Sequence, residues 1–178
     1  MDISGALPCV EGGVRVRRLE YRDVQAFADG TEDAAVRAYG HLPLSNYTAE
    51  IVRHQIDGVI ADGLADGSLA VLAIADTATD EFLGSVVLFD ITATRAEVGF
   101  WLTPAARGRG VAQQALRAAI RLAAHAGLST LDARTVPENE GSIRVLKSQG
   151  FVQTGGPQQA QTPSGETLTA LTFERSTR

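Results

Sequence analysis

The feature that most constrains the fold is a glycine- and arginine-rich loop between an apolar strand and an amphipathic helix. The loop reads Arg107-Gly108-Arg109-Gly110 and follows an apolar run that ends at Leu102. A helix is predicted after it, from roughly residues 109–126, because its apolar residues recur at helical spacing. Its predicted core face holds Leu116, Ala119, Ile120 and Ala123. A strand that turns directly into a helix is typical of proteins in which a sheet lies against helices.

The start of this helix lacks the residues that normally satisfy its free backbone N–H groups. Residues 105–112 contain no Ser, Thr, Asp or Asn, which are the usual caps. Gly108 and Gly110 would let a ligand approach the backbone, and two arginines and the helix dipole add positive charge. The pattern predicts a site for phosphate or pyrophosphate, with a solvated helix start as the alternative. No Lys follows the glycines, which disfavours a nucleoside triphosphate.

The remaining chain alternates short apolar segments with turn residues, which predicts one mixed sheet of α/β or α+β type. We expect a loose leader over residues 1–13 and a single domain over residues 14–178. Residues 155–165, rich in Gly, Pro, Gln and Thr, are predicted to form an exposed loop, and residues 30–47 give mixed signals. Strands are predicted from residue 14 and over 69–75, 82–89, 95–102, 128–136, 150–154 and 168–173; helices are predicted over 21–29, 48–67 and 137–149.

Composition narrows the class of protein. The chain has 178 residues, 44% of them hydrophobic, and a net charge of −5 without a Lys/Arg cluster that would favour nucleic acid. Cys9 is the single cysteine, and we find neither a signal peptide nor an apolar run of about 18 residues that would span a membrane. We therefore predict a cytoplasmic protein that binds neither nucleic acid nor membrane.

The three histidines share no metal-ligand spacing, so we predict no metal site. We interpret all three as structural or solvated: His41, His54 and His125.

Three blocks of the sequence resemble the GNAT superfamily of N-acetyltransferases. Arg107-Gly108-Arg109-Gly110-Val111-Ala112 matches that family's acetyl-CoA signature, Gln/Arg-x-x-Gly-x-Gly/Ala. Glu97-Val98-Gly99-Phe100-Trp101-Leu102 and Asn139-x-x-Ser142, with Gly150-Phe151 after it, resemble the branch of ribosomal-protein N-terminal acetyltransferases. The resemblance covers roughly residues 14–174. It implies a mixed, mostly antiparallel sheet with helices on both faces, splayed between the strand that ends at Leu102 and the strand that starts at Leu128.

The resemblance also implies acetyl-CoA as co-substrate and no metal. The pantetheine arm would lie in the splay and pair with the backbone of the strand end as an added strand does. The backbone N–H groups of the glycine loop would hold the pyrophosphate. The implied cofactor-binding residues are Trp101, Leu102, Thr103, Arg107, Gly108, Arg109, Gly110, Val111, Ala112 and Asn139.

Two residues are candidates for the chemistry. Glu97 would take the proton of the attacking amine, through a water, with a surface carboxylate on the strand as the alternative. The departing thiolate needs a proton donor, and Leu146 stands where many relatives have a Tyr, which leaves Ser142. Asn139 and Ser142 could instead have a structural role, as the N-cap and the third residue of a helix.

The implied reaction is acetylation of a primary amine by direct attack through a ternary complex. The acceptor would be a protein N-terminus or a small molecule, held in a pocket formed by residues 30–67 and 155–165. One alternative is a CoA-binding or sensing module without turnover, and another is a nucleotide-binding protein. Homodimer formation is left open.

Overall fold

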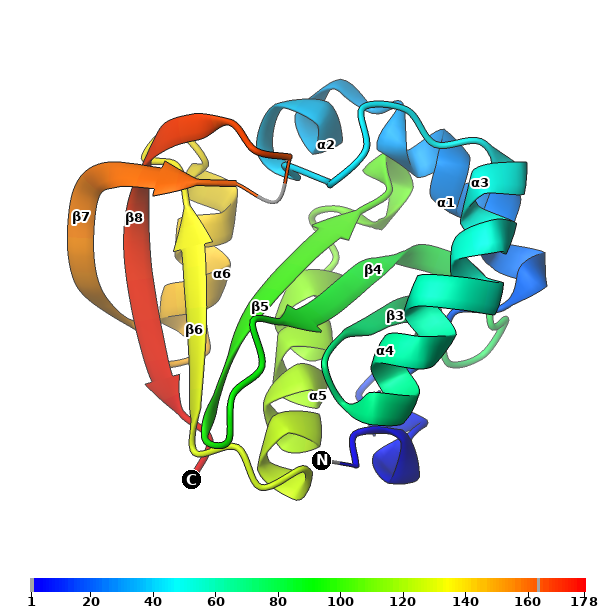
Figure 1. Cartoon of the computed structure of the whole chain (residues 1–178), viewed down its shortest axis with the longest axis horizontal. Coiled ribbons are helices and arrows are strands. Elements are labelled where there is room, and N and C mark those ends of the chain that lie inside the picture. Colours follow the sequence, from blue (N-terminus) through cyan, green and yellow to red (C-terminus); the bar gives the residue numbers. More distant parts are fainter. Residues whose placement is uncertain (1, 163) are drawn as a thin grey trace.

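The computed structural model describes residues 2–162 and 164–178, which form an eight-stranded sheet with helices on both faces (Figure 1). The strand order is β1-β2-β3-β4-β5-β6-β8-β7, and among the described strands β5 and β6 make the one parallel pair. The predicted mixed, mostly antiparallel sheet is confirmed. The strands are β1 (Cys9–Glu11), β2 (Val14–Arg18), β3 (Ala70–Asp76), β4 (Phe82–Phe89), β5 (Arg95–Leu102), β6 (Thr130–Thr135), β7 (Val152–Gln161) and β8 (Thr167–Ser176).

Two helical layers cover the sheet. The helices are α1 (Val24–Thr31), α2 (Ala34–Tyr39), α3 (Ala49–Gln55), α4 (Ala61–Asp66), α5 (Val111–His125) and α6 (Glu140–Ser148). In Figure 1, α5 and α6 lie behind the sheet, whereas α1, α3 and α4 lie in front of β3 and β4. Strand β3 packs against both helical layers, because Leu72 and Ile74 are buried on the α5 side of the sheet and Ala73 is buried on the α1 side.

Local sequence explains most of these elements. The predicted apolar face of α5 is fully buried, with Leu116 and Ala119 each 1% exposed. The helix predicted over residues 48–67 is instead divided into α3, a π-helical turn over Ile56–Ile60, and α4. Gly58, with φ −117° and ψ −108°, supplies the break, since a residue without Cβ tolerates this backbone.

The predicted splay between two central strands is present. Strands β5 and β6 pair through only three positions, which match Arg95 with Thr130, Ala96 with Leu131 and Glu97 with Asp132. Beyond these pairs, β5 continues to Leu102 and β6 to Thr135 without pairing with each other, and Figure 1 shows the two strands diverging. One edge of β5 is thereby left open from Val98 onward.

The prediction of a loose leader over residues 1–13 is wrong for the residues that the structure describes. Strand β1 pairs with β2, matching Cys9 with Val16. Ile3 is fully buried and Cys9 is 8% exposed, both in the cluster that α5 completes. Apolar burial holds this segment to the domain, and β1 has only three residues, too few to show a strand period.

The prediction of an exposed loop over residues 155–165 is confirmed in its exposure for most of the described residues, but it is wrong in its structure over most of its length. Strand β7 runs to Gln161 and pairs with β8 in a long hairpin. The register shifts between Gln153 and Gly155 and again between Gly155 and Gln158, so irregular pairing accommodates the Gly and Pro residues. Position 163 of the predicted loop lies outside the described residues.

Candidate functional site

The start of α5 has the open geometry that its sequence predicts. Gly108 and Gly110 have φ of +72° and +75°, which favour glycine, and Gly110 is the N-cap without a side-chain cap bond. Within the described chain, no protein acceptor takes the backbone N–H groups of residues 108–113. A Cβ built on Gly108 would meet nothing within 4 Å. The loop therefore presents several free donors beside empty space, which suits an anion.

Arg107 contributes less positive charge to this loop than its sequence position suggests. Its guanidinium pairs with Asp33 and donates to the carbonyl of Leu102 at 3.0 Å. Asp33 is itself the N-cap of α2, accepting from the N–H groups of Ala35 and Val36 at 3.1 Å. The hydrogen bond from Arg107 lowers the pKa of Asp33 below its usual value. The side chain of Arg107 thus ties the loop to α2, and exposed Arg109 is the arginine left for an anion.

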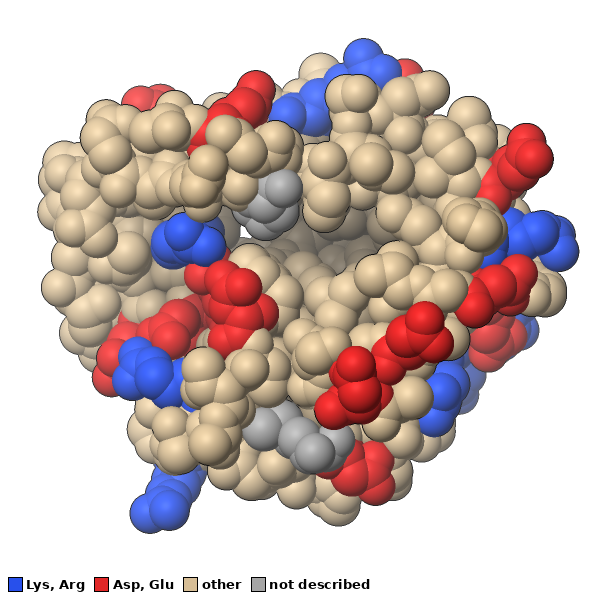
Figure 2. All heavy atoms as spheres, viewed as in Figure 1, with Lys and Arg blue, Asp and Glu red and all other residues tan. Residues whose placement is uncertain are grey.

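A cavity of about 300 Å³ lies where β5 and β6 separate. Its floor is the front of β4, β5 and β6, and its rim includes the segment from Tyr39 to Pro43 and the hairpin residues Ala160 to Thr162. Figure 2 shows this face hollowed near its middle, with mostly uncharged residues around the hollow. Both segments predicted to surround an acceptor, residues 30–67 and 155–165, contribute to its wall.

The end of β5 lies between this cavity and the glycine loop. The Trp101 ring is buried in an aromatic cluster, with its centroid 5.1 Å from that of Phe27 in an edge-to-face arrangement. The backbone of Thr103 is already used, because its N–H donates to Leu83 at 2.9 Å and its carbonyl accepts from Ala106 at 3.0 Å. The edge of β5 that faces β6 has no strand partner from Val98 to Leu102, although the carbonyl of Leu102 accepts from Arg107.

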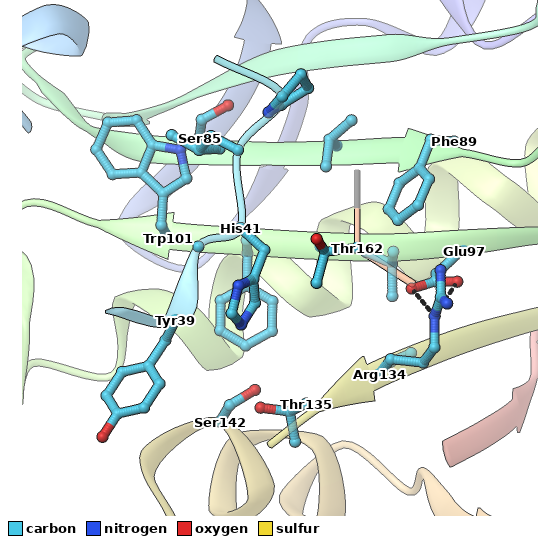
Figure 3. A pocket seen from close by; sticks show the side chains of 18 of the residues that line it. Tyr39, His41, Ser85, Phe89, Glu97, Trp101, Arg134, Thr135, Ser142 and Thr162 are labelled. Carbon is cyan, nitrogen blue, oxygen red and sulfur yellow. Dashed lines mark hydrogen bonds and ion pairs between the residues drawn. The ribbon is translucent and has the colours of Figure 1, made fainter. Parts of the chain in front are cut away.

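Glu97 lies in the cavity wall and is ion-paired. Arg134 Nε donates to both carboxylate oxygens of Glu97 at 2.9 Å, across the mouth of the splay (Figure 3). Burial raises the pKa of Glu97, and Arg134 partly offsets that effect. Arg134 also donates to the carbonyl of Gln161 at 3.2 Å, which joins β6 to the hairpin. The sequence did not single out Arg134; an isolated cation on an otherwise mixed strand was its only signal.

Asn139 and Ser142 adopt the capping arrangement and line the cavity at the same time. Asn139 is the N-cap of α6, and its Oδ1 accepts from the N–H of Ser142 at 3.2 Å. The Ser142 hydroxyl makes no hydrogen bond to the described residues, and Leu146 is buried behind it. The structure thus brings Glu97, Asn139 and Ser142 to one cavity, while residues 107–112 lie outside its wall.

Other classes of site receive no support from the described residues. They hold no group of three His, Cys, Asp or Glu side chains able to ligate a metal. None of their helices has both the length and the apolar character needed to cross a bilayer.

Comparison with known proteins places this geometry among acetyl-transferring domains. The family described as acetyltransferase (GNAT) domain matches residues 14–152. The probable N-acetyltransferase YjcK of Bacillus subtilis (strain 168) is 35% identical over 80 residues, which are 43% of this chain. The matched region spans only 44% of the length of that relative.

Solved structures are similar over nearly the whole chain. Mycobacterium smegmatis RimJ, solved in complex with CoA-disulfide, superposes with a TM-score of 0.80 at 20% identity, covering 95% of this chain and 85% of its own. Spermidine N-acetyltransferase from Vibrio cholerae, in complex with CoA and spermine, superposes with a TM-score of 0.77 at 16% identity, covering 93% of this chain and 96% of its own. At these identities the likeness is one of fold.

Proposed function

The chain belongs to the acetyltransferase (GNAT) family, and we propose that it transfers the acetyl group of acetyl-CoA to a primary amine by direct attack in a ternary complex. The observation that carries the proposal is the uncapped start of α5, whose free N–H groups follow the open edge of β5 after a 3-10 turn (Pro104–Ala106) and the glycine loop. A diphosphate bound to the start of α5 and an extended pantetheine bound along the open edge of β5 would leave the thioester facing the cavity. The co-substrate is acetyl-CoA.

The pyrophosphate is proposed to bind the backbone of Gly108, Arg109, Gly110, Val111 and Ala112. Arg109 adds its charge, whereas Arg107 acts through its backbone because its side chain is held by Asp33. Pantetheine amides pair with the open edge of β5. Asn139 reaches the arm from the other side of the splay, where it lines the cavity.

Glu97 is the proposed base for the amine. It is the carboxylate in the cavity wall, and burial raises its pKa toward the range where it can both accept and release a proton. The role of Arg134 is to hold that carboxylate in place on both of its oxygens. The oxyanion of the tetrahedral intermediate would be stabilised by a backbone N–H near the end of β5.

The acceptor is proposed to be an amine with one positive charge and an apolar neighbour, either a peptide N-terminus or a small molecule. Glu97 and Arg134 are the charged residues that line the cavity among the described residues, and they neutralise each other. Phe89, Phe100 and Tyr47 supply much of the remaining wall. A polyamine such as the spermine bound by the Vibrio cholerae structure would leave further ammonium groups without carboxylate partners.

With acetyl-CoA, we expect phenylethylamine and a tetrapeptide with a neutral first residue to give at least about tenfold higher kcat/KM than spermidine. Unpaired charges in an apolar cavity are the reason for this order. Release of free thiol measures the rates, and mass spectrometry identifies the acetylated product. A higher kcat/KM for spermidine would contradict the proposed class of acceptor, but it would still support the proposal that the protein transfers acetyl groups.

Replacing Ser142 with Ala should lower kcat about tenfold with little change in KM for acetyl-CoA, since the hydroxyl is proposed to protonate the leaving thiolate. The cap of α6 survives, because it uses the backbone N–H of this residue. Ser148→Ala on the same helix is the control, and its hydroxyl is bonded to the carbonyl of Val145 at 2.8 Å. Equal kcat values in the two variants would remove Ser142 from the mechanism.

A CoA-binding module without turnover is the second candidate, because Leu146 occupies the position of the expected Tyr. It predicts heat on titration with acetyl-CoA but no thiol release with any amine of the panel. A cytoplasmic location stays a prediction from the sequence, and homodimer formation stays open.

A further inference from the structure

His41 enters the cavity from the segment between α2 and α3. Its backbone has φ of +46°, a left-handed conformation that is uncommon for residues other than glycine and costs conformational energy. In the view of Figure 3 its imidazole stands inside the pocket between Trp101 and Ser142. Strain of this kind persists where the surrounding structure holds the residue in place, and such positions are often functional.

The Nε2 atom of His41 is the one buried side-chain nitrogen or oxygen without a hydrogen-bond partner among the described residues. Leaving such an atom unsatisfied is costly, so each instance in a folded protein calls for an explanation. Two other polar groups of the wall are engaged, because Ser85 donates to the carbonyl of Leu72 at 2.9 Å and Asn139 caps α6. The Ser142 hydroxyl has no partner among the described residues, but it is not a buried atom. The Glu97 carboxylate is held on both oxygens by Arg134.

The surroundings of His41 favour the neutral form of its imidazole, which can accept a hydrogen bond. Burial lowers the pKa of His41, and the carboxylate of Glu166 on the β7–β8 hairpin opposes that effect without reversing it. The other charged groups of the wall are Glu97 and Arg134, and their charges cancel. A neutral imidazole has one nitrogen that donates and one that accepts.

We infer that His41 is a binding residue for the acceptor, whose amine donates a hydrogen bond to Nε2. This inference rests on the proposed function. In the tautomer that carries its proton on Nδ1, Nε2 is an acceptor without a donor. An amine supplies that donor, and the apolar walls strengthen the bond by excluding water. The sequence interpretation of His41 as structural or solvated did not foresee this role, since no spacing pattern marks a single unsatisfied atom.

Two substitutions separate binding from a merely structural role. Asn tolerates a left-handed backbone well, but its amide ends near the position of Nδ1 and falls short of Nε2. Gln is less suited to the backbone, yet its Oε1 can reach the position of Nε2 and accept a hydrogen bond. We expect His41→Asn to raise KM for phenylethylamine about tenfold or more, and His41→Gln to recover part of that loss.

KM for acetyl-CoA should stay within about twofold of the wild-type value in both variants, and His54→Asn on α3 is the matched control. A structural role predicts the opposite order, with Asn better than Gln. That order, or an unchanged KM for phenylethylamine in His41→Asn, overturns the inference.

A second measurement uses the wild-type protein, so it does not depend on a folded variant. Phenylethylamine is titrated into the CoA-loaded wild-type protein while the histidine ring nitrogens are followed by ¹⁵N NMR. A saturable shift of one buried ring nitrogen supports the inference, and the absence of any such shift while thiol is released with this amine refutes it. If the amine shifts that nitrogen but no thiol is ever released, the proposed function fails and the amine site remains.

Discussion

Affinity for acetyl-CoA is expected to fall by at least about a hundredfold when Gly110 is replaced with Asp, while the fold keeps its thermal stability. Position 110 is the N-cap of α5, and Asp is among the residues that tolerate its left-handed φ of +75°. A carboxylate there offers the free N–H groups an acceptor of their own and complements the helix dipole. The same charge would repel the diphosphate and occupy its donors, each charge-assisted bond being worth about 1.5–3 kcal/mol.

Gly110→Asn is the matched control, because it has the same shape without the charge. The affinity of the Gly110→Asn variant for coenzyme A should fall less than that of the Gly110→Asp variant. The difference between them measures the effect of the negative charge, because the two side chains have nearly the same size. Calorimetric titration with coenzyme A measures both affinities, and thermal unfolding without ligand confirms that α5 is intact. Equal affinities in the Asp and Asn variants would show that the start of α5 does not hold the phosphates.

The sequence could predict the parts of this site that are built from neighbours in the chain. The helical period of α5 and its missing cap are both local features, and the structure has both. The open edge of β5 was implied by family resemblance, and the three-position pairing with β6 agrees with it. The pairing of Arg107 with Asp33 could not be predicted, because the two residues lie 74 positions apart in the sequence.

Other features could not be predicted because they depend on residues that are far apart in the sequence. Strand β7 contains Gly155 and Pro157, which locally favour a loop, but pairing with β8 outweighs that preference. Strand β1 is too short to show a period, and its burial depends on α5. The strain and unsatisfied nitrogen of His41 are properties of the folded cavity rather than of any pattern in the sequence.

Glu97→Gln should lower kcat/KM for the amine by about 10²–10³ at neutral pH if the carboxylate is the base. A base works only when deprotonated, and burial raises the pKa of Glu97. The kcat/KM of the wild-type enzyme should therefore rise with pH as Glu97 loses its proton, at a pH above the range in which carboxyl groups ordinarily titrate. That rise should vanish in Glu97→Gln, whereas the rise caused by ionisation of the free amine should remain. A pH–rate profile of kcat/KM measures both rises.

The ion pair supplies a rival explanation that the double variant resolves. Glu97→Gln also leaves the half-buried guanidinium of Arg134 without its charged partner, which could distort the mouth of the splay. Arg134→Gln removes that charge, so Glu97→Gln/Arg134→Gln pairs two neutral amides across the same gap. A purely structural Glu97 predicts that the double variant regains most of the activity lost in Glu97→Gln. A catalytic Glu97 predicts that activity stays low while thermal stability recovers, because a restored contact cannot replace a proton acceptor.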